Sequence, residues 1–289
     1  MKRNSLLLPG LGAICLLMLN PGPAAGAADC EELRKNIQQE RNLIRKQQLL
    51  YEAVAACPQD ARIHYEKGYG EERLRRYDQA LSYYLRAVEL DPDFARAFFG
   101  LGDVYVVLGN LGPAIQAYEA GLALDPDHVR ARSSLELAQI KYRSERGEQI
   151  TPDEFVRVMQ ESRQQGTTAG ALDGPLLRMQ ILFQINSAEL TASAKEQLAM
   201  VGAALTDPAL SGQRFEIAGH TDSTGSPEVN LPLSKERAEQ VRQYLMEEYG
   251  VSPERLTIAY YGDTRPAVPN DTAANRAINR RVEFRRLSD

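Results

Sequence analysis

The chain has 289 residues, a length that suggests about two domains. Hydrophobic residues make up 43% and charged residues 25% of it, which is ordinary for a globular protein. The net charge of −5 and the lack of a basic stripe interleaved with aromatic residues argue against a nucleic-acid-binding protein. Three histidines, at positions 64, 128 and 220, would all have to meet from different segments to form a multi-histidine metal site, so we predict no metal and no cofactor.

Residues 1–27 have the composition of a secretory signal peptide. The segment begins with the basic Met1-Lys-Arg-Asn, continues with a mostly apolar run and ends at the small-residue pair Ala25-Gly-Ala27. Neither Cys15 nor Cys30 follows a small residue, so a lipid anchor is not expected. No later run is long enough to cross a bilayer, and we predict an exported protein with no transmembrane segment after signal cleavage.

Residues 28–60 form an N-terminal helical segment, either one long helix or a bent pair. The stretch is rich in Glu, Arg, Lys and Gln, and no Gly or Pro interrupts it until Pro58. A continuous helix, at ~1.5 Å per residue, would hold Cys30 and Cys57 about 40 Å apart, far beyond disulfide distance. A disulfide would therefore require a helical hairpin within residues 31–57.

Residues 61–148 contain an internal repeat. Small residues, a tyrosine and a proline recur thirty-four residues apart: Gly68, Ala80, Tyr84, Ala87 and Pro92 match Gly102, Ala114, Tyr118, Gly121 and Pro126. This pattern resembles tetratricopeptide repeats, which are stacked helix pairs. Such stacks form a concave groove that commonly receives peptides, so the resemblance implies a protein partner, here an unidentified periplasmic or outer-membrane protein. A spacer without a partner is the alternative.

Residues 149–176 join the repeats to the C-terminal part. Thr151-Pro-Asp-Glu154 is a capping box with proline in the first turn, which predicts a short helix from about Pro152 to Gln164. The following Gly- and Thr-rich stretch, residues 166–175, has the composition of a flexible linker. We therefore expect the two domains to move relative to each other.

Residues 177–289 alternate between strand and helix patterns. The predicted strands are residues 178–185, 215–218, 256–261 and 281–286, and the predicted helical segments are 192–205, 234–248 and a short turn at 272–277. The order β-α-β-α-β-turn-β predicts one mixed sheet with helices on one face. Because this sheet domain follows an all-α repeat domain, we assign the whole chain to the α+β class.

The loop after residues 215–218 carries the charged residues of most interest. Ser234 resembles a helix N-cap, which would place Arg237 in the first helical turn, where the helix dipole disfavours a cation. A carboxylate ligand would relieve that conflict, and Asp222 supplies the opposite charge for an ammonium. The loop therefore suits a zwitterion, unless Asp222 and Arg237 simply pair with each other. Both readings remain open at this level.

Several motifs in this region occur in the same order as in a known family. Gly219-His-Thr-Asp222, then Asn230-x-x-Leu-Ser234-x-x-Arg237, then Asn279-Arg-Arg-Val282 resemble the OmpA-like peptidoglycan-binding domain, over roughly residues 177–287. That family holds the diaminopimelate of the peptidoglycan stem peptide with the aspartate and arginine that match Asp222 and Arg237. The resemblance also implies that further polar residues line the pocket: Thr221, Asn186, Asn230 and Arg281.

Other residues of the region depart from that pattern or lie outside it. Family members often carry Phe-Asp where this chain has Phe183-Gln184, which leaves the contribution of the first loop open. We assign Arg276, Arg280 and Arg285 to the solvated surface, and place His220 behind the binding loop.

The resemblance implies a non-enzymatic protein of the periplasm, associated with peptidoglycan and with the outer membrane. A scaffold that contacts only proteins is the alternative. Enzymatic activity is not expected, since the chain has no His-Glu-x-x-His or Gly-x-Ser-x-Gly motif and no cysteine after Cys57.

Overall fold

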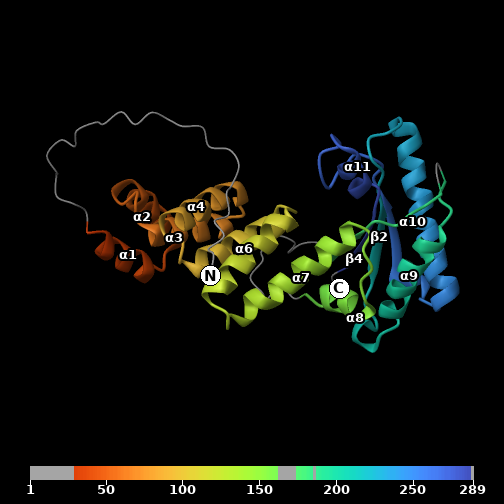
Figure 1. The fold of residues 1–289 in the computed structure, drawn as a ribbon, viewed down its shortest axis with the longest axis horizontal. Coiled ribbons are helices and arrows are strands. Elements are labelled where there is room, and N and C mark those ends of the chain that lie inside the picture. Colours follow the sequence, from red (N-terminus) through yellow and green to blue (C-terminus); the bar gives the residue numbers. More distant parts are fainter. Residues whose placement is uncertain (1–28, 162–173, 185–186, 288–289) are drawn as a thin grey trace, which may run out of the picture.

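The computed structural model describes residues 29–161, 174–184 and 187–287, which form a helical array followed by a sheet with helices packed on it (Figure 1). The predicted signal peptide, most of the predicted linker and Asn186 lie outside these residues. The array consists of α1 (Cys30–Gln39), α2 (Leu43–Ala56), α3 (Ala61–Arg73), α4 (Tyr77–Leu90), α5 (Ala95–Val107), α6 (Leu111–Leu124) and α7 (Val129–Glu145).

The N-terminal segment is a helical hairpin, not one long helix. The chain breaks between α1 and α2, where the Asn42 side chain caps α2 by accepting a hydrogen bond from the backbone N–H of Arg45. The hairpin brings Cys30 and Cys57 to a Cα–Cα distance of 5.9 Å, and they form a disulfide. The bridge closes the base of the hairpin beside the small apolar cluster of Ile37, Leu50 and Ile63.

The repeats stack as the thirty-four-residue period predicts. Two glycines of the repeat lie against an aromatic ring of the neighbouring helix: a Cβ added to Gly102 would come within 2.5 Å of the Tyr118 ring, and one added to Gly68 within 2.9 Å of the Tyr84 ring. The helices therefore approach closely only because these positions lack side chains. Helix α3 lies against α5, and α5 against α7, so these three form one layer of the stack.

The C-terminal part is a four-stranded mixed sheet with the strand order β1-β4-β2-β3. Strands β2 and β3 pair in parallel, and β4 is antiparallel to both of its neighbours. Its elements are β1 (Leu176–Met179), α9 (Ala192–Leu205), β2 (Phe215–Gly219), α10 (Pro227–Tyr249), β3 (Leu256–Tyr260), α11 (Ala273–Asn279) and β4 (Val282–Arg286). The α+β class and the mixed sheet are confirmed.

Helix α10 begins earlier than the sequence indicated. It starts at Pro227, so Ser234 is a fully buried residue within the helix and not its N-cap, and Arg237 lies well beyond the first turn. Proline usually occurs in the first turn of a helix, but Pro232 lies inside α10. The helix-dipole argument for an anion at Arg237 is therefore wrong, and another argument has to account for this arginine.

The short helix α8 (Pro152–Met159) has the predicted capping box, but it is not an isolated linker helix. Phe155 is fully buried and its ring contacts that of Phe284 at 5.8 Å, in the core of the C-terminal sheet. Helix α7 joins the same core through Leu137 and Ile140, while its Ala131 and Ala138 pack into the repeats. Helices α7 and α8, the described part of the junction, are thus packed on the core of the C-terminal sheet.

Two carboxylates are buried between the stacked helices of the repeats. The Tyr84 hydroxyl donates to Glu72 at 2.7 Å, and the Tyr118 hydroxyl donates to Asp103 at 2.7 Å. Burial raises the pKa of Glu72 from 4.5 to about 7, against the opposing effect of the hydrogen bond from Tyr84. Glu72 therefore changes its charge near neutral pH.

This shift makes the stability of the repeats depend on pH. The folded chain holds the Glu72 proton below about pH 7, and the unfolded chain holds it only below an ordinary glutamate pKa of about 4.3. The contribution of Glu72 to the free energy of unfolding therefore rises as the pH falls between these values, by up to about 4 kcal/mol. We expect Glu72→Gln to be the more stable protein at pH 8.5 and to lose that advantage by pH 5, measured by urea unfolding. A difference that does not change with pH would contradict this.

Candidate functional site

The candidate site is built on the loop that joins β2 to α10. Strand β2 ends at Gly219, where the backbone touches α10: a Cβ at this position would lie 2.0 Å from the carbonyl oxygen of Ser234. The Ser234 hydroxyl donates to the Leu231 carbonyl at 2.7 Å and accepts from the Gly262 N–H at 3.0 Å. Gly219 of β2 and the buried hydroxyl of Ser234 thus hold α10 against two loops, one that follows β2 and one that follows β3 at Gly262.

Thr221 and Asn230 hold this loop from within. The Thr221 N–H donates to the Gly262 carbonyl at 2.9 Å, and the Asn230 side-chain amide donates to the Asp222 carbonyl at 3.3 Å. Both residues are buried, with 4% and 3% of their surface exposed. The Thr221 hydroxyl has no hydrogen-bond partner among the described residues. Both predicted residues therefore lie beside Asp222, where they position its backbone.

Asp222 is paired with Arg280, a residue that we had assigned to the solvated surface. The Arg280 guanidinium donates to one carboxylate oxygen at 2.5 Å, and the Thr224 N–H donates to the other at 2.8 Å. Burial acts against ionisation, but these two hydrogen bonds outweigh it and lower the pKa of Asp222 below its ordinary value. Asp222 is only 5% exposed, whereas the Arg280 side chain that covers it is 47% exposed. One half-exposed side chain therefore covers the carboxylate.

Arg237 comes from α10 and is buried without a carboxylate partner in the described part of the chain. Only 9% of its surface is exposed. Its Nε donates to the Ser187 carbonyl at 3.3 Å, and its guanidinium lies 4.8 Å from the centre of the Phe183 ring. Burial lowers its pKa, and the nearby positive charge of Arg280 lowers it further. The alternative that Asp222 and Arg237 pair directly with each other is not what the structure shows, because Arg280 holds the carboxylate of Asp222.

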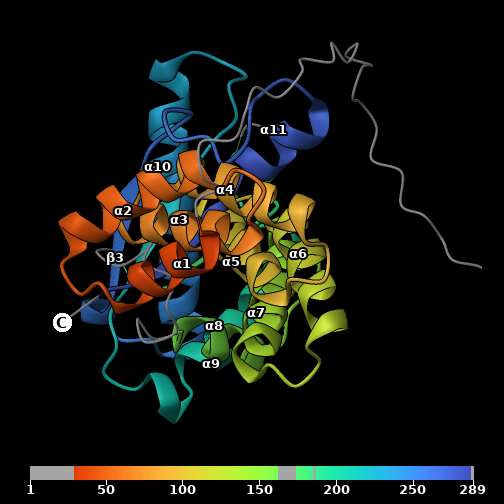
Figure 2. The same ribbon diagram turned by 90° about the vertical axis from the view of Figure 1, so that its left-hand side faces the viewer.

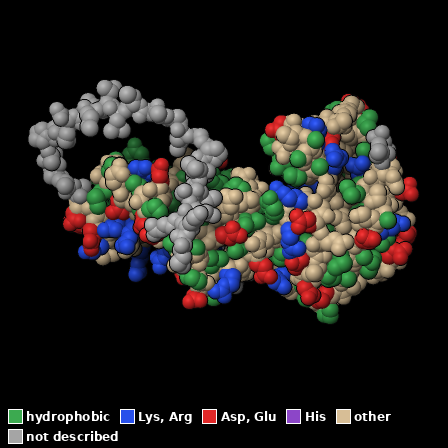
Figure 3. All heavy atoms as spheres, viewed as in Figure 1, with side chains coloured by type: hydrophobic (Ala, Val, Ile, Leu, Met, Phe, Trp, Pro, Cys, Tyr) green, Lys and Arg blue, Asp and Glu red, His purple; other side chains and the backbone are tan. Residues whose placement is uncertain are grey.

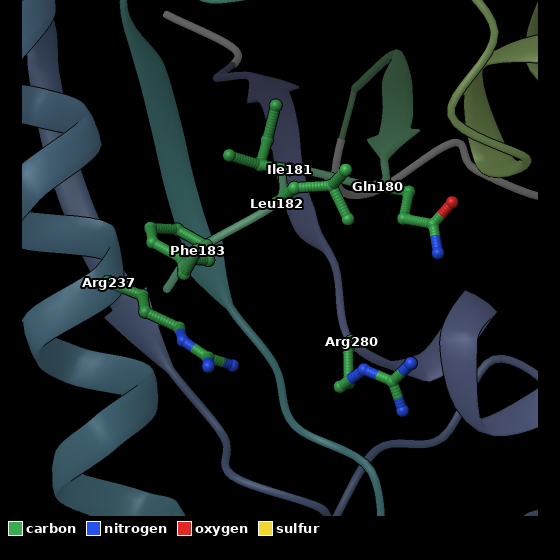
Figure 4. Close-up of a pocket in the computed structure, with 6 residues that line it drawn as sticks. All are labelled: Gln180, Ile181, Leu182, Phe183, Arg237 and Arg280. Carbon is green, nitrogen blue, oxygen red and sulfur yellow. The ribbon is translucent and has the colours of Figure 1, made fainter. Parts of the chain in front are cut away.

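Arg237 and Arg280 line one pocket together (Figure 4). The remaining lining residues belong to the segment after β1: Gln180, Ile181, Leu182 and Phe183. In the space-filling view, Lys and Arg side chains gather in the hollow between the α11 segment and the rest of the sheet domain (Figure 3). The pocket offers two guanidinium groups, one of them unpaired, beside an apolar wall. Such a site favours a carboxylate or another planar anion.

Arg281 does not reach the pocket. Its guanidinium donates twice to Glu283, at 2.9 and 2.7 Å, and both side chains are buried. Neighbours along a strand point to opposite faces of a sheet, so Arg281 and Glu283 lie opposite the core residues Val282 and Phe284. Arg281 is therefore not among the residues that line this pocket, whereas Arg280, one residue earlier, is.

His220 belongs to the same buried charge cluster as Arg281. Its Nε2 lies 3.5 Å from Glu283, its ring packs 5.3 Å from that of Tyr261, and burial lowers its pKa. Arg178 of β1 also contacts Glu283 and extends the cluster to Glu145 of α7, each at 3.1 Å. His220 thus supports the loop from behind. Among the described residues no group of His, Cys, Asp or Glu could hold a metal ion.

Comparison with known proteins assigns both halves of the chain. The model of the OmpA family matches residues 182–280, and a tetratricopeptide repeat model matches residues 48–92 and 65–129. The peptidoglycan-associated lipoprotein of Pseudomonas aeruginosa is 35% identical over 128 residues, which cover 42% of this chain and 74% of that protein. Outer membrane porin F of Pseudomonas fluorescens is 52% identical over 68 residues, 24% of this chain and 21% of that protein.

A solved structure of the periplasmic domain of Helicobacter pylori MotB is also similar, at 26% identity and a TM-score of 0.36, with 40% of this chain and 78% of that chain covered. The mixed sheet with its β2–α10 loop defines an OmpA-type domain behind a tetratricopeptide array. The chain belongs to the OmpA family. It spans about a fifth of the length of the porin F proteins that it matches. In the described residues, no helix is both long and apolar enough to span a membrane.

Substitution of Gly219 tests the contact between β2 and α10. We expect Gly219→Ala to lower the free energy of unfolding by about 1–3 kcal/mol or more, because its methyl group would meet backbone and not a movable side chain. Gly112→Ala in α6 is the matched control, since its Cβ meets only an ordinary contact at 3.5 Å from Tyr142. Chemical denaturation measures both variants. Equal free energies of unfolding for the two variants would show that the backbone contact between β2 and α10 has room for a methyl group.

Proposed function

We propose that the chain is a non-enzymatic protein of the periplasm that binds peptidoglycan through the pocket beside Asp222, Arg237 and Arg280. The observation that carries the proposal is the unpaired guanidinium of Arg237. Burying a cation without a counter-charge costs free energy, and the fold retains it at 9% exposure. An anionic ligand that enters the pocket would recover that cost. The name of the peptidoglycan-associated lipoprotein, a relative over the same region, supports peptidoglycan as the source of the ligand.

The proposed ligand group is the free end of diaminopimelate, which carries an ammonium and a carboxylate on one carbon. Its carboxylate would bind Arg237 and Arg280, and its ammonium would bind Asp222. The hydrogen bond between Asp222 and Arg280 must then open, so Arg280 would neutralise Asp222 while the site is empty and turn to the ligand when it is filled. Thr221 and Asn230 would hold the loop during this exchange. Asn186 stays a proposed pocket residue.

Affinity for one stem peptide should be modest. A hydrogen bond to a charged group contributes about 1.5–3 kcal/mol, and breaking the Asp222–Arg280 pair offsets part of the gain. Many stem peptides lie along one polymer, so a protein that holds a second envelope component would gain from multivalent attachment. We propose that the repeats supply this second attachment by binding a periplasmic or outer-membrane protein.

Sedimentation with purified diaminopimelate-type sacculi tests the pocket. We expect Asp222→Asn and Arg237→Ala each to weaken binding about 10- to 100-fold, because each removes one charge-assisted contact. Arg276→Ala is the matched control, since its guanidinium donates to the Asn270 carbonyl and it is not among the pocket residues. Sacculi that sediment all four proteins equally would disprove the pocket assignment.

The ligand itself can be tested with two soluble stem peptides. One carries diaminopimelate and the other carries lysine, which has the ammonium but lacks the terminal carboxylate. We expect calorimetric titration to detect only the first, and the preference to disappear in Arg237→Ala. Equal binding of both peptides by the parent protein would show that the guanidinium groups do not bind the terminal carboxylate.

A further inference from the structure

The repeats place an arginine at the same position of three successive helices. Arg62, Arg96 and Arg130 are each the second residue of their helix, in α3, α5 and α7, and they lie thirty-four residues apart. Helix α3 contacts α5, and α5 contacts α7, so the three helices form one layer of the stack, and the end-on view shows them in this order (Figure 2). Stacked pairs curve, and the layer whose helices approach more closely lies on the concave side. Because α3, α5 and α7 are in closer contact than α4 and α6, the period places the three arginines on the helices of the concave layer.

The three arginines do not have equal partners. Arg130 pairs with the buried Asp103 of α5. The residue of the first repeat that corresponds to Asp103, thirty-four positions earlier, is Tyr69. Arg96 consequently lacks the acid that Arg130 has, and neither Arg96 nor Arg62 forms an ion pair within the described ranges. Both are exposed.

The surroundings of Arg96 add aromatic surface and a further cation. The Arg96 guanidinium interacts electrostatically with Tyr65. Tyr69 is 41% exposed, and its hydroxyl accepts a hydrogen bond from the exposed Arg73 at 3.4 Å. We call the set of Arg62, Tyr65, Tyr69, Arg73 and Arg96 the arginine face.

The acids near this face do not cancel its charge. Glu72 and Asp103 are only 7% and 4% exposed, and each is held by a tyrosine hydroxyl beneath the surface. Glu66, which also lies close to Tyr65, forms an ion pair with Lys46 of α2 at 3.8 Å. A partner that approaches the arginine face therefore meets three guanidinium groups and two phenol rings, while the acids lie below or are already paired.

We propose that the arginine face binds an extended acidic segment of a partner protein, an inference that rests on the proposed role of the repeats in binding a protein. Guanidinium groups bind carboxylates with good geometry, and the tyrosine rings offer apolar contact to the residues between them. A concave face suits a linear segment and not a flat bilayer. A long polyanion such as nucleic acid would also meet the negative charge of the whole chain, −5, whereas a short segment meets only the arginine face. Farther along α7, Leu137 and Ile140 are buried in the C-terminal core, which confines the segment to α3, α5 and the first turn of α7.

Fluorescence anisotropy with the full mature chain tests this proposal. The probe is a labelled twelve-residue peptide of alternating Glu and Leu, compared with the same peptide carrying Gln or Lys in place of Glu. We expect binding of the Glu peptide alone, at least 10-fold weaker in 300 mM than in 50 mM salt, because exposed charges are screened. Equal binding of the Gln peptide would overturn the proposal.

Variants locate the peptide on the protein. We expect Arg62→Ala combined with Arg96→Ala to weaken binding at least 10-fold, and Arg96→Lys to weaken it less, since the charge remains. The control is Arg86→Ala on α4, whose arginine is paired with Glu89 at 2.7 Å. The substituted arginines are exposed, so the melting temperature should not change. Undiminished binding by the double variant would overturn the proposal.

The proposal for the arginine face and the proposal for the pocket beside Arg237 can be tested independently. Asp222→Asn combined with Arg237→Ala should retain peptide binding, and the Arg62/Arg96 double variant should still sediment with sacculi. Loss of peptide binding in the pocket variant would place the peptide in the pocket and overturn the proposal for the arginine face.

Discussion

The candidate site depends on the guanidinium of Arg237, which is buried and forms no ion pair with an acid among the described residues. Its only described hydrogen bond goes to a backbone carbonyl, and its flat face lies on Phe183. The guanidinium of Arg280, in the same pocket, repels that of Arg237 and is itself held by Asp222. A protein optimised for stability alone would place an acid or an apolar residue here. The arrangement makes sense if an anion from outside completes it.

The rest of the C-terminal part serves to hold Arg237 and Asp222 in register. The two residues come from different elements, a loop after β2 and the interior of α10, and the contact of Gly219 with Ser234 joins those elements at backbone distance. Behind the loop, Glu283 gathers Arg281, Arg178 and His220 into a buried cluster. Each of these three side chains lies beside the carboxylate of Glu283, whereas Arg237 forms no ion pair with an acid among the described residues. The structure thus separates paired charges that support the loop from the unpaired charge that faces the pocket.

The sequence predicted the elements better than it predicted the directions of side chains. Repeat period, capping box and strand alternation were sufficient for the α+β class, because each depends on local spacing. The Asn279-Arg-Arg motif was not sufficient to choose between Arg280 and Arg281, since neighbours at the start of a strand point to opposite faces and the start was uncertain by one residue. The role of Ser234 was missed for a related reason: a buried hydroxyl that joins a helix to a distant loop at Gly262 has the same sequence signature as an N-cap.

Helix α7 packs against both the repeats and the C-terminal sheet. One side of it packs into the repeats through Ala131 and Ala138, and the other packs into the sheet domain through Leu137 and Ile140. At its end, the Ser144 hydroxyl donates to the Arg178 carbonyl of β1 at 2.8 Å, and Glu145 pairs with the Arg178 side chain. The helix therefore covers the otherwise open edge of β1, which would be exposed if the chain were cut before Leu177. One continuous helix therefore packs against both the repeats and the sheet domain within the described residues.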